Sequence, residues 1–206
     1  LWQHQGGDRD APERTLARAV TLVDELHRRH ADDLEVLITF GGVHAAMGAL
    51  RTTRQEHAEA VRQHELVRDA ALARSETAET NADLHYHLAM AGSNLLQAHF
   101  LLGQPEAALA AGEAGLRHLE RGLALDARHV ALRDLAATLL ARVATARFAT
   151  DDLEGGIATL QSMCARQDWG PDTREQGALL LSQKLRDLED HPQRTPWLER
   201  LATDLR

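Results

Sequence analysis

Residues 82–120 read ADLHYHLAMAGSNLLQAHFLLGQPEAALAAGEAGLRHLE, two Ala- and Leu-rich segments separated only by Gly103-Gln104-Pro105-Glu106. In each segment apolar or small residues recur every three or four positions, which places them on one face of an α-helix. The first stripe is Leu84, Leu88, Ala91, Leu95, Ala98 and Leu102, and the second is Leu109, Gly112, Leu116, Leu119 and Leu123. Because the break is short, the stretch predicts two antiparallel helices in contact.

The same arrangement recurs along the chain. DLEVLITFGGVHAAMGAL begins at Asp33, DLHYHLAMAGSNLLQAHF begins at Asp83, and a third, shortened copy runs from Leu132 to Leu160. Each copy passes through a break into a second Ala-rich helix. A period of about fifty residues built from helix pairs indicates a solenoid, in which each pair buries its apolar face on the next.

Helix-start signals support this reading. Capping residues, capping boxes and prolines in a first turn occur at nine places. These are Asp10-Pro12-Glu13, Asp32-Asp33, Thr53-Glu56, Thr80-Asn81-Asp83, Gln104-Pro105, Asp126, Asp151-Glu154, Asp172-Glu175 and Thr195-Pro196.

Three stretches resemble the tetratricopeptide (TPR) repeat family. LLGQPEAALAAGEAGL and TDDLEGGIATL are similar to the family's turn, with Gly near the break and small residues in the following helix. ARHVALRDLA resembles a sequence common in TPR arrays attached to bacterial serine/threonine kinases and related signalling proteins. The resemblance spans roughly residues 12–168. It implies an all-α, right-handed α-α superhelix of about nine antiparallel helices with a concave groove. Residues 1–11 would be a tail and 169–206 capping helices.

Composition narrows the function classes. Hydrophobic residues make up 44% of the chain and aromatic residues only 3%. Strand-forming residues are therefore scarce. The net charge of −8 disfavours nucleic acid, which requires phosphate neutralisation. The single cysteine, Cys164, cannot form an internal disulfide, and no apolar run is long enough to span a membrane. The first residue is Leu and no signal-peptide pattern follows, so the expected location is cytoplasmic, in a domain that could come from a longer chain.

The twelve histidines do not predict a metal site. His57 and His64 on one helix would stand roughly 10 Å apart, too far to share an ion. His85 and His87 point to different sides of a helix, and His27 and His30 suit the helix C-terminus that they occupy. HELVR, from His64, has Arg68 where a zinc-protease motif needs its second histidine.

Searches for catalytic motifs also fail. Neither a phosphate-binding Gly-rich loop nor a nucleophile elbow is present. Cys164 continues the stripe of Leu153, Ile157 and Leu160, as a core residue would. Close approach between helices is the expected reason for Gly41-Gly42, and a hinge is the alternative. No enzymatic activity, cofactor or metal is predicted.

The candidate site is the side of each first helix opposite its core stripe. In the central copy this side carries Tyr86, Met90, Ser93, Asn94 and Gln97. The corresponding residues earlier in the chain are Val36, Phe40, Val43, His44 and Met47, opposite Leu34, Ile38, Gly41 and Ala45. Later in the chain they are Asp134, Thr138, Ala141, Arg142 and Thr145. These residues would form a wall that is apolar at one end and polar at the other. The alternative is that a neighbouring helix or the N-terminal tail covers Phe40 and Met47.

Three functions follow, in order of preference. The first is a non-catalytic scaffold that binds a peptide or protein segment in the groove, as the interaction arm of a bacterial signalling protein. The second is a structural module that buries the apolar wall in a homodimer or larger homo-oligomer. The third is a helical enzyme whose site carries no recognisable motif.

Overall fold

The computed structural model describes residues 11–74, 80–165, 171–187, 195–196 and 199, and the chain forms eight α-helices and no strand within these ranges. The helices are α1 (Ala11–Arg29), α2 (Leu34–Thr53), α3 (His57–Leu72), α5 (Ala82–Leu101), α6 (Pro105–Leu125), α7 (Val130–Ala149), α8 (Leu153–Ala165) and α9 (Pro171–Asp187). An all-α fold is thereby confirmed for the described part of the chain. The expected tail, the boundary near residue 168 and almost all of the ninth helix fall outside it.

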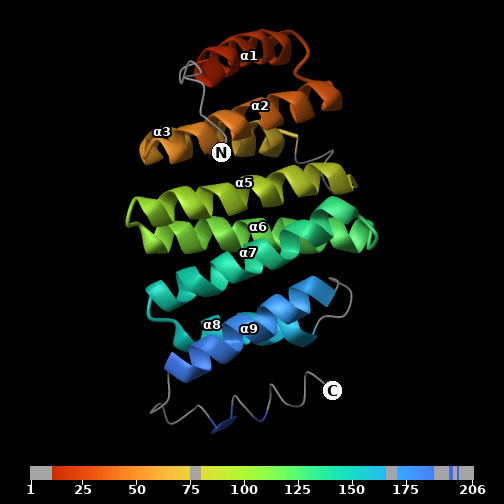
Figure 1. The fold of residues 1–206 in the computed structure, drawn as a ribbon. Coiled ribbons are helices and arrows are strands. Elements are labelled where there is room, and N and C mark those ends of the chain that lie inside the picture. Colours follow the sequence, from red (N-terminus) through yellow and green to blue (C-terminus); the bar gives the residue numbers. More distant parts are fainter. Residues whose placement is uncertain (1–10, 75–79, 166–170, 188–194, 197–198, 200–206) are drawn as a thin grey trace, which may run out of the picture.

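The helices stack in chain order, from α1 at one end of the molecule to α9 at the other (Figure 1). Each packs mainly on the helices before and after it. In addition, α5 contacts both α2 and α7, and α7 contacts α9. These four, called the first helices below, therefore follow one another along the array, while α3, α6 and α8 pack between consecutive first helices. The predicted helical array is confirmed.

Local capping explains several of the helix starts. The Asp33 carboxylate accepts hydrogen bonds from the backbone N–H groups of Glu35, at 2.8 Å, and Val36, at 3.4 Å. The Asn81 side chain accepts one from Leu84 N, at 3.2 Å, and Asp152 one from Gly155 N, at 2.9 Å. Such bonds satisfy N–H groups that have no partner within the helix.

The turn at the centre of the quoted stretch has the expected chemistry. Gly103 follows the end of α5 with a φ of 70°, a conformation that glycine adopts without steric cost. Pro105 then occupies the first turn of α6, where its missing N–H would have had no helical partner. The two helices are therefore forced into the antiparallel pair that the sequence predicts.

Two predicted starts need correction. Asp126 ends α6, and its carboxylate accepts a hydrogen bond from Arg128 N; the N-cap of α7 is His129, whose Nδ1 accepts one from Leu132 N at 3.2 Å. Thr53 is the last residue of α2, where its hydroxyl donates to the carbonyls of Ala49 and Leu50. A threonine or aspartate beside a break can close one helix as well as open the next.

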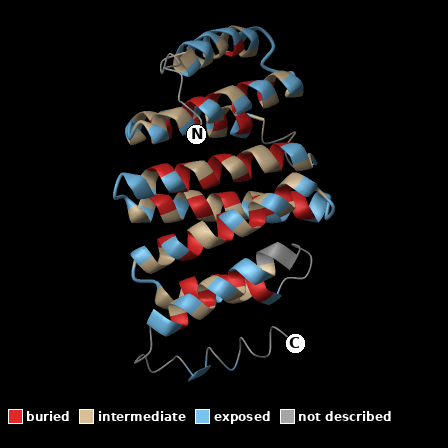
Figure 2. Ribbon diagram, in the orientation of Figure 1, coloured by how far each residue is buried: buried red, intermediate tan, exposed pale blue. Residues whose placement is uncertain are grey.

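The largest core cluster runs through α5, α6, α7, α8 and α9, and buried residues mark the inner face of each helix (Figure 2). Leu119, Leu132, Leu139 and Leu181 are fully buried in it. Cys164 is also fully buried there, which confirms it as a core residue. Because its thiol is away from solvent, a nucleophilic role has no support.

Glycines permit a close approach of the α5 and α6 backbones. A Cβ atom added to Gly92 would lie 2.6 Å from Gly115 Cα and 2.8 Å from the Ala111 carbonyl oxygen. Both are backbone atoms, which cannot move aside as a side-chain tip can. The same construction at Gly41 meets only ordinary contacts, and at Gly42 it meets nothing within 4 Å. Close approach therefore does not explain Gly41-Gly42, contrary to the prediction.

Gly92→Ala is expected to destabilise the protein by about 2 kcal/mol, because α5 and α6 must separate to admit the methyl group. Gly42→Ala is the matched control: Gly42 is exposed within a helix, so alanine should stabilise the protein by roughly 0.5–1 kcal/mol. Urea denaturation followed by circular dichroism measures both. Equal effects of the two substitutions would show that the α5–α6 contact is looser than described.

Candidate functional site

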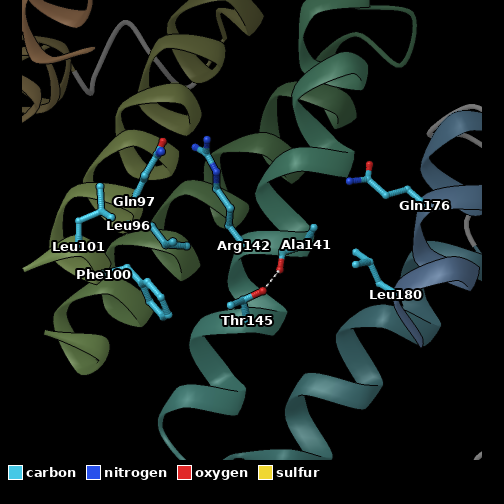
Figure 3. Close-up of a pocket in the computed structure, with 9 residues that line it drawn as sticks. All are labelled: Leu96, Gln97, Phe100, Leu101, Ala141, Arg142, Thr145, Gln176 and Leu180. Carbon is cyan, nitrogen blue, oxygen red and sulfur yellow. Dashed lines mark hydrogen bonds between the residues drawn. The ribbon is translucent and has the colours of Figure 1, made fainter. Parts of the chain in front are cut away.

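A groove with a volume of about 350 Å³ lies where three first helices, α5, α7 and α9, meet (Figure 3). We call it the α5/α7/α9 groove. Its lining consists of Leu96, Gln97, Phe100 and Leu101 from α5, Ala141, Arg142 and Thr145 from α7, and Gln176 and Leu180 from α9. Within each helix the lining residues are one, three or four positions apart, so each helix offers one continuous strip. The volume falls within the range of ligand pockets in proteins.

The groove has apolar walls and a few polar groups. Leu96 is buried at its base, whereas Phe100 and Leu101 keep 38% and 46% of their surface exposed. Large apolar side chains are usually more buried than this in a folded protein. Their exposure beside a concavity indicates a surface that a ligand could cover. Gln97, Arg142, Thr145 and Gln176 supply the polar atoms.

Arg142 is the only charged residue that lines the groove among the described residues. Its Nη1 donates hydrogen bonds to the Ser93 hydroxyl, at 2.9 Å, and to the Ser93 carbonyl, at 3.2 Å. Burial lowers the pKa of the Arg142 guanidinium, and among the described residues no carboxylate forms an ion pair with it. A partly desolvated cation therefore faces a mostly apolar concavity.

Ser93 does not have the role predicted for it. The expectation was that its hydroxyl would hold a bound backbone, but Ser93 is buried and its hydroxyl and carbonyl both accept from Arg142. It positions the arginine instead. Of the other residues predicted on α5, Gln97 lines the groove. Asn94, which follows Ser93 in the sequence, is half-buried and is not among the lining residues.

The apolar end of the predicted wall is covered. Phe40 is 6% exposed and Met47 is 4% exposed, so neither is free surface, and the alternative reading of these two residues is correct. The Phe40 ring lies 4.6 Å from the His27 ring of α1 and 4.2 Å from that of His44, measured between centroids. The helix α1 therefore covers this side of α2.

Polar contacts secure the same region. His44 is buried, with Nε2 at 2.9 Å from Asp24 Oδ1 on α1 and Nδ1 at 2.8 Å from Gln63 Oε1 on α3. One side chain thus ties three helices together. Val36 and Val43, also predicted to bind a partner, are half-buried on α2.

The remaining predicted residues are not brought into the groove. Tyr86 and Met90 are half-buried nearer the N-terminus of α5, and Tyr86 packs on the main core with its ring stacked 6.0 Å from that of His129. Thr138 is exposed on α7 but does not line the cavity. The structure therefore unites Gln97 with Ala141, Arg142 and Thr145, and leaves Val36, Phe40, Val43, Met47, Tyr86, Met90 and Thr138 elsewhere.

Five lining residues were missed by sequence reasoning: Leu96, Phe100, Leu101, Gln176 and Leu180. A signal existed for Leu101, because the polar strip of α5 steps by four residues from Ser93 to Gln97 and then to Leu101. No such signal exists for α9, which lies outside the three sequence copies.

Two histidines of the described chain, His85 and His118, lie side by side. His85 Nδ1 and His118 Nδ1 are 3.2 Å apart, and burial, followed by the charges of His85 and two arginines, lowers the pKa of His118 to about 4. Across the described residues, no three His, Cys, Asp or Glu side chains are grouped as a metal site would require. None of the described helices is long and apolar enough to cross a membrane.

No protein-family model, curated protein or solved structure matches the chain.

Proposed function

We propose that the chain is a non-catalytic interaction scaffold that binds a peptide or protein segment in the α5/α7/α9 groove. The supporting observation is the groove itself, where exposed Phe100 and Leu101 stand beside the polar groups of Gln97, Arg142 and Thr145. Apolar walls supply most of the binding free energy, and a few polar groups fix the orientation of what is bound. An extended or helical peptide could lie along the groove because its wall is built from parallel strips of three helices.

The repeat pattern supports the same proposal. The pairs α2–α3, α5–α6 and α7–α8 correspond to the three sequence copies, and successive first helices touch one another. We propose that these pairs are TPR-like units of a right-handed superhelix, with the first helices on its concave side. The resemblance to arrays of bacterial signalling proteins favours a role as the interaction arm of such a protein.

Leu101→Asp is expected to reduce partner capture from a bacterial lysate by at least about tenfold, because it places a charge in the apolar wall. Leu66→Asp is the matched control: Leu66 is also 46% exposed, but it lies on α3 and does not line the groove. Affinity capture with quantitative mass spectrometry compares both with the unaltered protein. If Leu66→Asp abolished capture and Leu101→Asp did not, the groove would not be the binding surface.

The second candidate is self-association. Phe100, Leu101 and Leu102 are three consecutive exposed apolar residues at the end of α5, and a second copy could cover them. Sedimentation velocity over a range of concentrations distinguishes the two functions. A monomer supports the scaffold, whereas a dimer that Leu101→Asp dissociates would support the structural module.

A further inference from the structure

We propose that the α5/α7/α9 groove recognises a peptide segment through one Asp or Glu side chain, which pairs with Arg142, and through apolar side chains that flank it. The inference rests on the proposed function and specifies the chemistry of the partner. It makes Arg142 the residue that determines specificity and Phe100, Leu101 and Leu180 the apolar surface around it.

The charge of Arg142 is unbalanced in the described chain. Two other half-buried arginines have carboxylate partners: Arg147 Nη2 lies 2.9 Å from Glu113, and Arg51 Nη1 lies 3.0 Å from Glu13 and 2.7 Å from Glu56. Among the described residues, Arg142 has hydrogen bonds only to the neutral Ser93. Removing a cation from water is costly unless an anion compensates, and the groove is the open side from which one could approach.

The geometry leaves the guanidinium available. Ser93 receives hydrogen bonds from Nη1 alone, so among the described residues no acceptor is bound to Nε or Nη2. Figure 3 shows Arg142 extending from α7 towards α5, next to Gln97. A guanidinium fixed along one edge can bind a carboxylate through two parallel N–H···O bonds, and the Gln97 amide lines the same groove.

The surroundings select for one carboxylate rather than many. Leu96, Phe100 and Leu180 form a low-dielectric wall, in which a charge pair is stronger than in water. The chain as a whole carries a net charge of −8, which repels a strongly acidic partner. A segment with a single acidic residue between apolar ones fits both conditions.

The test uses a phage-displayed library of random dodecapeptides, selected against the full chain. Enriched peptides are synthesised in two forms, one with the acidic residue and one with the corresponding amide, Gln or Asn. Their affinities are measured for the unaltered protein, for Arg142→Gln and for Arg133→Gln. Gln keeps a donor for Ser93, and Arg133, nine residues earlier on α7, lies about 180° around the helix.

We expect enriched peptides to share one Asp or Glu flanked by Leu, Ile, Val, Phe or Met. Arg142→Gln should weaken peptide binding at least about tenfold. Replacing the acidic residue of the peptide by its amide should weaken binding to the unaltered protein by a similar factor. The two changes together should weaken binding little more than either one alone. Arg133→Gln should have no effect. Circular dichroism and thermal melting of Arg142→Gln verify that the variant is folded, and Arg142→Lys, which keeps the charge without the two-bond geometry, should bind with intermediate affinity.

Two results would overturn the inference in different ways. Peptides that lack an acidic residue, bind the groove and lose affinity with Leu101→Asp would disprove the role of Arg142 while leaving the scaffold function intact. If no peptide were enriched above background, both the inference and the proposed function would fail.

Discussion

Phe40→Ala is expected to lower the free energy of unfolding by about 3–4 kcal/mol, because truncating a buried aromatic side chain removes apolar burial and leaves a cavity. Phe40 is 6% exposed and packs between His27 of α1 and His44 of α2. Among the described helices, α1 has substantial contact only with α2, so the loss should be concentrated where these two meet. Urea denaturation gives the magnitude, and amide hydrogen exchange should show α1 losing protection first.

Thr39→Ala is the control for Phe40→Ala, since Thr39 is the preceding residue on α2 and is exposed. It should change stability by no more than about 0.5 kcal/mol. A Phe40→Ala protein of unchanged stability that no longer bound a partner would show that Phe40 is surface, as the sequence pattern had suggested, and that α1 does not cover it.

Acidification from pH 7 to pH 4 is expected to cost about 3 kcal/mol of stability through His64 alone. Burial lowers the pKa of His64 from 6.5 to about 4, and the side chain is 4% exposed. Its Nδ1 has no hydrogen-bond partner in the described part of the chain, and its ring occupies space that a Cβ on Gly48 would fill. The folded state therefore requires the neutral imidazole, which is apolar enough for this site.

The direction of the pH effect follows from proton binding. Between pH 6.5 and pH 4 the unfolded chain binds a proton at His64 and the folded chain does not, so lowering the pH favours unfolding. The contribution of His64 to the free energy of unfolding is complete above pH 6.5. It falls by about 1.4 kcal/mol for each pH unit below that value. Burial also lowers the pKa values of His85, His87 and His118, which therefore act in the same direction.

Urea midpoints measured between pH 7.5 and pH 5 test the His64 prediction, because this window lies above the titration of most carboxylates. His64→Leu should flatten the dependence by about 1 kcal/mol per pH unit, whatever its effect on absolute stability. His30→Gln, at an exposed position, should leave it unchanged. If the stability of His64→Leu depended on pH as steeply as that of the unaltered protein, the His64 ring would be protonated and solvated in the folded protein.

The helices could be predicted from the sequence because the signals that specify them are local. Asp33, Asn81 and Pro105 cap or open helices through groups within three residues, and Gly103 ends α5 through its own φ. Where one residue could serve two helices the prediction failed: Asp126 closes α6, and His129 caps α7.

The groove could be predicted only in part because burial depends on distant elements. The α2 stripe with Phe40 and Met47 has helical spacing whether it is an open binding surface or part of the core. Only the position of α1 decides that it is core. Ser93 looks like a free hydroxyl until Arg142, on another helix, is placed against it. By contrast, Ala141, Arg142 and Thr145 follow from the repeat offset, which brings equivalent positions of neighbouring first helices together.

Site-specific photo-crosslinking tests most directly whether another polypeptide occupies the α5/α7/α9 groove. Benzoylphenylalanine would replace Phe100, which lines the groove, and in a second protein Leu66, which does not. The groove proposal predicts a light-dependent adduct with a different polypeptide from position 100 and none from position 66. No adduct from position 100, or equal adducts from both positions, would contradict it, and an adduct with twice the mass of the chain would show that a second copy fills the groove.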